Sequence, residues 1–223
     1  EGIAFTVSTD EKVAFPFYLR IPSWTQKAEV RVNGKKVSAA PVAGKYLCIN
    51  REWANGDRVE LTLPMSLSMR TWQVNKNSVS VDYGPLTLSL KIAEKYVEKD
   101  SRETAIGDSK WQKGADPQKW PTTEIYPDSP WNYSLVLDKK EPLKNFKVIR
   151  KSWPADNYPF TVASVPLEVK AIGRPVPEWK IDETGLCGVL PEEDAVKGDK
   201  EEITLIPYGC GTVENLCVPE HKR

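Results

Sequence analysis

The chain has 223 residues, and its 31 Lys and Arg balance 31 Asp and Glu, so the formal net charge is zero. A nucleic-acid backbone or an anionic membrane attracts a basic surface, and without a polybasic run we expect neither partner. Eighteen Pro and eight Trp without helical periodicity indicate strands joined by rigid loops.

The first alternating runs lie at residues 3–7 and 15–21. In the second run large apolar side chains occupy the odd positions, while Pro16, Tyr18 and Arg20 occupy the even ones. A period of two buries one face of a strand and leaves the other in water. Residues 28–33 repeat the pattern and close on Asn33-Gly34, which favours a type I′ hairpin.

More alternating runs follow at a spacing typical of a small β-sandwich, so we predict a first antiparallel sandwich over residues 1–93. The remaining strands of this region are expected at residues 45–49, 58–64, 67–71, 78–83 and 86–92.

The character changes at residues 94–121, which are polar and irregular, so we place a domain boundary near residue 93. Residues 94–223 are predicted to form a second sandwich with long loops, with single helical turns near Glu94 and Glu193. The predicted fold class is all-β, with two antiparallel sandwiches of jelly-roll or immunoglobulin-like type and little helix. The candidate strands of the second domain are residues 122–126, 133–137, 146–150, 167–173 and 202–207.

The cysteines and the single histidine do not form a recognisable metal or catalytic motif. Cys48, Cys187, Cys210 and Cys217 permit three pairings, and we favour free thiols. Their spacing with His221 lacks the knuckle of a zinc site, so we predict no metal. Because His221 lies three residues from the end of the sequence, a Ser-His-Asp triad is not expected either.

Acidic clusters at residues 192–194 and 201–202 are more typical of a solvated surface than of the paired carboxylates of glycoside hydrolysis. We therefore predict no catalytic residue in this chain.

Aromatic residues in the second half are the stronger candidates for contacts. Their flat rings can stack on the C–H face of a sugar, or can pack against the sandwich or a neighbouring domain. Proline neighbours, as in Trp120-Pro121 and Trp153-Pro154, favour packing. The candidates for carbohydrate or domain contact are Trp111, Trp120, Trp131, Tyr133, Trp153, Tyr158 and Trp179.

Several short motifs resemble one family. They are FYLRIPSW at residues 17–24, VRVNG at 30–34, REW at 51–53, LPM at 63–65, GPL at 84–86, PEW at 177–179 and ITLIPYGC at 203–210. Together they resemble the non-catalytic C-terminal half of glycoside hydrolase family 127, the β-L-arabinofuranosidase-like enzymes, and of the related family 146. The resemblance is most specific before residue 93 and weakest over residues 94–160.

The resemblance implies an (α/α)6 catalytic barrel followed by β-sandwich domains. In that barrel a cysteine thiolate acts as nucleophile beside a zinc ion held by cysteines, two of them adjacent, and a glutamate. This sequence has no adjacent cysteine pair, so no catalytic residue and no cofactor is carried over to it. Zinc is expected only in the barrel of a longer polypeptide.

The resemblance also implies the partners. They are the barrel of the same polypeptide and an arabinose-containing plant-type glycan, in a periplasmic or secreted setting. Two alternatives remain: a stand-alone carbohydrate-binding module that uses the loop aromatics, and a small hydrolase.

Overall fold

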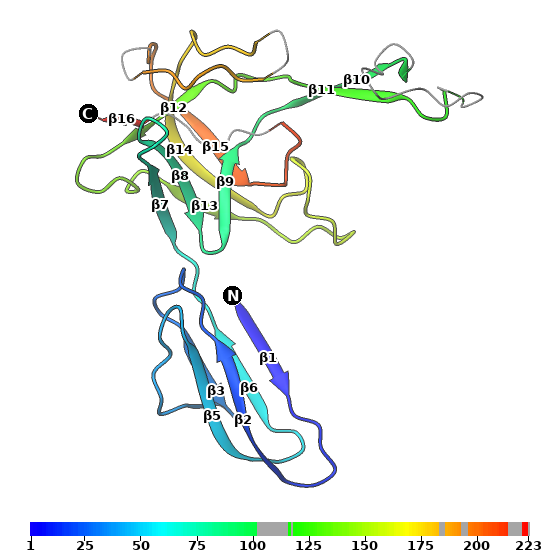
Figure 1. The fold of residues 1–223 in the computed structure, drawn as a ribbon, viewed down its shortest axis with the longest axis vertical. Helices are drawn as coiled ribbons and strands as arrows, with labels where there is room; N and C mark the ends of the chain where they lie inside the picture. Colours follow the sequence, from blue (N-terminus) through cyan, green and yellow to red (C-terminus); the bar gives the residue numbers. More distant parts are fainter. Residues whose placement is uncertain (102–115, 117, 183–185, 193–195, 214–219, 223) are drawn as a thin grey trace. The chain divides into compact units, whose positions relative to one another are not determined.

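The computed structural model describes residues 1–101, 116, 118–182, 186–192, 196–213 and 220–222. Nearly all the regular secondary structure of these residues is β-strand, which confirms the predicted fold class (Figure 1). The chain divides into two compact units, one of Glu1–Ser68 with Asp82–Leu86, the other of Met69–Val81 with Thr87–Arg223. No helix among the described residues is long and apolar enough to cross a membrane.

The first unit contains a four-stranded sheet, ordered β1-β6-β3-β4, and the separate pair β2-β5. All these pairings are antiparallel, and the β2-β5 register runs from Val13 opposite Trp53 to Arg20 opposite Tyr46. The strands are β1 (Gly2–Thr6), β2 (Val13–Arg20), β3 (Glu29–Val32), β4 (Lys35–Lys36), β5 (Tyr46–Trp53) and β6 (Arg58–Thr62).

The odd positions of β2 face the core of this unit, as the alternation predicts. Leu19 is buried, and Phe15 and Phe17 are half-buried against the same cluster. Trp53 lies at the centre with no exposed surface, and its indole nitrogen donates to the Phe15 carbonyl at 2.9 Å. β5 extends to this residue and so carries the indole into the core.

The predicted turn at Asn33-Gly34 is confirmed by the backbone. Asn33 and Gly34 have φ values of 50° and 76°, as a type I′ turn requires at both central positions. The Asn33 side chain also accepts a hydrogen bond from the Arg58 backbone N–H at 2.8 Å and donates to Asp57 at 2.7 Å. The turn is thus tied to the start of β6.

The second unit is built on one large sheet with the order β16-β12-β14-β15-β9-β8-β7, and β13 also pairs with β14 (Figure 1). Its pairings are antiparallel among those whose register is described, except for the parallel pair β12-β16. The strands are β7 (Leu67–Trp72), β8 (Ser78–Tyr83), β9 (Leu86–Leu90), β12 (Tyr133–Leu137), β13 (Lys147–Arg150), β14 (Leu167–Pro175), β15 (Glu201–Pro207) and β16 (Glu220–Lys222).

The chain passes between the units more than once: the first takes Glu1–Ser68 and Asp82–Leu86, and residue 93 lies within the second. The cause is a long-range pairing: β9 pairs with β15, with Leu90 opposite Leu205. Residues 78–81 and 87–92 therefore belong to the second unit, although their local alternation looks the same as that of the preceding strands.

Residues 94–99, which were predicted to belong to an irregular loop, form a strand that pairs with the strand predicted at residues 122–126. β10 (Glu94–Lys99) and β11 (Thr122–Pro127) form an antiparallel ladder from Glu94 opposite Pro127 to Lys99 opposite Thr122. The predicted helical turn near Glu94 is therefore wrong, because the residue begins a strand. The turn predicted near Glu193 lies outside the described residues.

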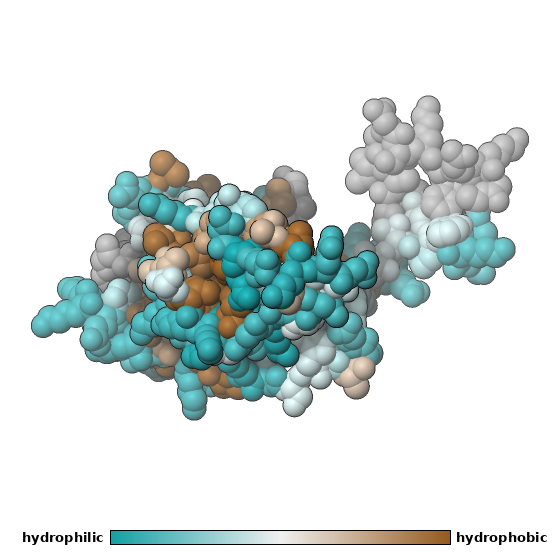
Figure 2. All heavy atoms as spheres, turned by 90° about the horizontal axis from the view of Figure 1, so that it is seen from below, coloured by the Kyte–Doolittle hydropathy of each residue, from teal (hydrophilic) through white to brown (hydrophobic). Residues whose placement is uncertain are grey.

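The surface has mixed polarity. On the face drawn in Figure 2, hydrophobic side chains show between hydrophilic ones, as is usual for folded proteins.

Candidate functional site

The structure separates the predicted aromatic candidates into two groups by exposure. Trp120, Trp153 and Tyr158 are exposed, at 71%, 61% and 55% of their surface. Tyr133 and Trp179 are buried, and Trp131 is half-buried. Trp111 lies outside the described residues. Only the exposed side chains are available to a ligand.

The less exposed group forms a packing cluster at one end of β12 and β14. The rings of Trp131 and Trp179 lie 5.2 Å apart between centroids, tilted by 60°. The Trp179 indole donates to the Gly188 carbonyl at 3.0 Å, and the Asn132 amide donates to the carbonyls of Val176 and Trp179. The Asn132 amide and the Trp179 indole thus have internal partners, as expected of a structural cluster.

Tyr133 is buried, and its hydroxyl group has a carboxylate as its partner. Burial and a hydrogen bond to Glu201 raise the pKa of the Tyr133 hydroxyl to about 12. A hydroxyl with this pKa stays protonated at neutral pH and is a poor base or nucleophile. Tyr133 thus contributes packing rather than chemistry.

Two of the exposed candidates share a loop with a residue that the sequence analysis missed. Residues 151–165 carry Trp153, Tyr158 and Phe160, which is 60% exposed. The Tyr158 and Phe160 rings meet edge to face at 5.6 Å, and the Trp153 indole donates to Asn157 at 2.7 Å. We call Trp153, Tyr158 and Phe160 the loop cluster. Loops lack periodicity, so no sequence pattern identified Phe160.

The loop that bears this cluster is anchored to β15 and to the turn after it. The Cys210 thiol contacts the Pro159 carbonyl at 3.5 Å. Val165, Ile206 and Cys210 form a small buried cluster, and Val162 packs against it. The loop cluster therefore stands on a packed base, which lowers the entropic cost of binding a ligand.

A carboxylate anchors the segment that follows β15. Glu94, at the start of β10, accepts hydrogen bonds from the backbone N–H groups of Thr212 and Val213 and from the Tyr96 hydroxyl at 2.6 Å. Partial burial opposes ionisation, but these donors outweigh it and lower the pKa of Glu94. Glu94 is thus an ionised clasp for residues 212–213 and not a proton donor.

Among the described residues of the second unit, the most buried carboxylate is paired with two lysines. Glu168 is 7% exposed, and its Oε1 lies 2.7 Å from Lys91 Nζ and 2.5 Å from Lys151 Nζ. Burial favours the protonated acid, but the two ammonium groups outweigh it and lower the pKa of Glu168. A general acid needs the opposite shift. Among the residues with resolved shifts, no carboxyl group has a raised pKa.

The described residues do not fit the zinc ion expected of the family's barrel. Within them, no three His, Cys, Asp or Glu side chains lie close enough to hold a metal ion. Cys48, Cys187 and Cys210 form no disulfide bond with one another, and Cys217 lies outside the described part of the chain.

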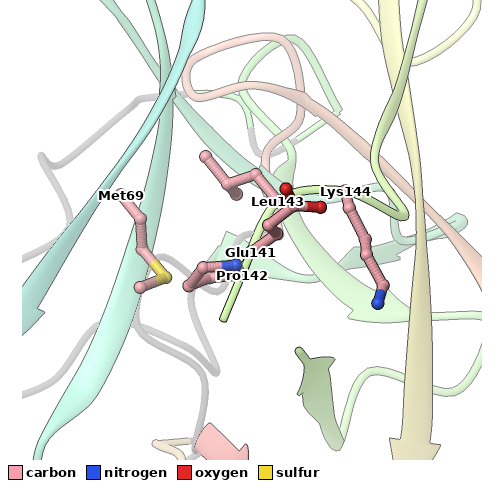
Figure 3. A pocket seen from close by; sticks show the side chains of 5 residues that line it. All are labelled: Met69, Glu141, Pro142, Leu143 and Lys144. Carbon is pink, nitrogen blue, oxygen red and sulfur yellow. The ribbon is translucent and has the colours of Figure 1, made fainter. Parts of the chain in front are cut away.

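A shallow hollow of about 340 Å³ lies beside β7 in the second unit. Met69, Pro142 and Leu143 give it an apolar wall, and Glu141 and Lys144 complete the lining (Figure 3). Figure 3 shows the Met69 thioether directed toward Pro142, with Lys144 on the far side. Glu141 is the one carboxylate among these residues, so the hollow lacks the pair that sugar hydrolysis needs.

Comparison with known proteins supports the resemblance found in the sequence. Residues 1–65 match the model of a family described as "Beta-L-arabinofuranosidase, GH127 middle domain". The first unit thus carries the sequence pattern of an accessory domain of that family. No curated protein matches the chain significantly.

Three solved structures share the fold. A glycoside hydrolase is 20% identical with a TM-score of 0.56, and the match covers 99% of this chain and 30% of that one. A GH127 β-L-arabinofuranosidase from Geobacillus stearothermophilus is 22% identical, with a TM-score of 0.55, over 100% and 28% of the two chains. A GH127 β-arabinofuranosidase is 19% identical, with a TM-score of 0.56, over 100% and 31%. The chain therefore spans about a third of the length of the structures that it matches.

Proposed function

We propose that this chain is the accessory β-sandwich region of a β-L-arabinofuranosidase-like glycoside hydrolase that acts on arabinose-containing glycans. It is non-catalytic by itself and supports an (α/α)6 catalytic barrel in the same polypeptide. The observation that carries the proposal is the match of residues 1–65 to the family's middle domain.

The protonation states of the described residues favour a structural, non-catalytic role. Glu94 and Glu168 are held ionised by donors and lysines, and Tyr133 is held protonated. These groups are fixed by partners that stabilise one protonation state, whereas acid–base catalysis needs a group that changes state near the working pH. We assign the cysteine nucleophile and the zinc ion to the barrel.

A second candidate function is a carbohydrate-binding module. The exposure of Trp153, Tyr158 and Phe160 on an anchored loop favours it. Trp120 is more exposed still and is a separate candidate. In a longer polypeptide the same rings could instead contact the barrel.

One experiment separates these functions. The 223-residue chain is incubated with an aryl β-L-arabinofuranoside and titrated, by tryptophan fluorescence, with arabinose- and galactose-containing oligosaccharides. The accessory role predicts no hydrolysis and no saturable response. Saturable quenching that is lost in Trp153→Ala but kept in Trp131→Phe supports the binding module. Hydrolysis by the chain itself overturns both.

The supporting role has its own measurement. In a longer polypeptide that also contains the barrel, deletion of this region is expected to lower the melting temperature and the yield of active enzyme. Unchanged melting temperature and unchanged activity after the deletion would contradict the proposal.

A further inference from the structure

The outer face of the pair β2-β5 presents flat side chains to solvent. The even positions of both strands point away from the core of the first unit, since Leu19 and Leu47 between them are buried. Tyr18 is 61% exposed and Tyr46 65% exposed, and Arg20 is exposed as well. These three side chains, with Cys48 and Asn50, are called the strand platform.

The register places the members of the platform side by side. Tyr18 lies opposite Cys48, Arg20 opposite Tyr46 and Pro16 opposite Asn50. Tyr18 and Tyr46 are thus diagonal neighbours on adjacent strands, a separation of about 7–8 Å that one ligand can bridge. Both strands are regular, so the rings are held by backbone pairing rather than by a loop.

One contact shows that side chains of the platform lean toward each other across the face. The Arg20 guanidinium lies 5.9 Å from the centroid of the Tyr46 ring, on the strand opposite. The large exposed fractions of Tyr18 and Tyr46 leave ring surface available to a ligand.

The positive charge of Arg20 is not balanced by a carboxylate of the platform. Glu52, at the other end of β5, pairs with Lys12 at 3.4 Å. Arg20 has a tyrosine ring as its partner and makes no ion pair with a described residue. A guanidinium recognises a carboxylate through two parallel hydrogen bonds, and its stem can still contact an aromatic ring.

From this arrangement we propose that the strand platform binds an acidic oligosaccharide, one that carries uronic acid residues. The two tyrosines would stack on the C–H faces of neighbouring sugars, Arg20 would bind a carboxylate, and Asn50 would bind hydroxyl groups. Tyrosine and arginine are also common at protein interfaces, so a lack of binding by the acidic sugar is the outcome that would point to a protein partner instead. The inference does not depend on the function proposed above.

The test is a calorimetric titration with linear trigalacturonate and with the neutral galactose trisaccharide of the same linkage. We expect saturable binding of the acid, and at least about ten-fold weaker binding of the neutral sugar. Tyr46→Ala and Tyr18→Ala should each weaken binding of the acid about ten-fold or more. Arg20→Gln should remove the preference for the acid and leave the weak neutral affinity unchanged.

The matched control is Tyr126→Ala, which removes an exposed tyrosine of the second unit and should leave affinity unchanged. Cys48 supplies a second readout, because trigalacturonate should slow its reaction with a thiol reagent but not the reaction of exposed Cys187. No binding of the acid, equal affinity for both sugars, or full affinity in both tyrosine variants would overturn the inference.

Discussion

The two units bear aromatic side chains in contrasting ways. In the first unit Phe15, Phe17 and Trp53 come from paired strands and meet inside a two-layer sandwich, with ring centroids 5.7–6.5 Å apart. In the second unit Trp153 and Tyr158 come from a loop and remain exposed. Inward-facing ladder positions of the first unit bury their rings, whereas the anchored loop at residues 151–165 displays its rings.

Trp53→Ala should destabilise the first unit by about 3–5 kcal/mol, because it empties the centre of the core. The substitution also leaves the Phe15 carbonyl without its indole donor. Urea unfolding followed by circular dichroism measures the loss. Trp120→Ala is the matched control and should change stability by less than about 0.5 kcal/mol. Equal losses in the two variants would break the contrast.

Glu168→Gln should destabilise the second unit by about 1–2 kcal/mol, since it leaves two partly exposed lysines without their shared carboxylate. Thermal unfolding of both proteins at pH 7 measures the effect. Glu178→Gln removes a carboxylate from an exposed pair with Lys197 and should have almost no effect. A Glu168 variant as stable as the parent would show that the buried triad only offsets its own desolvation.

Gly34→Ala should cost about 1 kcal/mol, because its φ of 76° is unfavourable for a side chain although nothing lies within 4 Å of the added Cβ. Gly2→Ala is the control, since it also adds a Cβ in open space but has no positive φ. The difference between the unfolding free energies of the two variants, measured by chemical denaturation, gives the cost of placing a side chain at a positive φ. If both behave alike, the turn is not a type I′ turn in solution.

Loss of the Glu94 carboxylate should have the smallest effect on the free energy of unfolding, and this effect should depend on pH. Because the folded-state pKa of Glu94 lies below its ordinary value of 4.5, its contribution is present above pH 4.5 and is lost as the pH falls through the folded value. Since the group is largely solvated, the loss should be less than about 1 kcal/mol. Glu94→Gln should flatten this part of the curve of stability against pH, and an unchanged curve would contradict the assignment.

The alternation of side chains was sufficient to predict most strands. Residues 78–83, 133–137 and 202–207 were predicted almost to the residue, because one or both faces of these strands are buried in a regular period. β10 escaped prediction, because Glu94 to Lys99 place charged side chains on both faces and leave no apolar stripe. Pairing with the predicted strand at residues 122–126, rather than composition, makes it regular.

The candidate site was less predictable than the fold. The sequence singled out Trp153 and Tyr158, but it gave Trp179 the same weight, although its ring is buried against Trp131. A local pattern does not tell whether a loop folds back over its own aromatic residue. For the strand platform, the alternation predicted that Tyr18 and Arg20 are exposed to solvent. Their positions beside Tyr46 on the neighbouring strand follow only from the pairing register.

The pairing of β9 with β15 also has a consequence for the order of events on the ribosome. Every strand of the two sheets of the first unit has been synthesised once Thr62 is added. β9, in contrast, must wait for Leu205 before its outer edge is covered, a delay of roughly 5–20 s at usual elongation rates. During that interval the hairpin of β8 and β9 is a nascent segment with an open edge, which makes it the natural client of a chaperone.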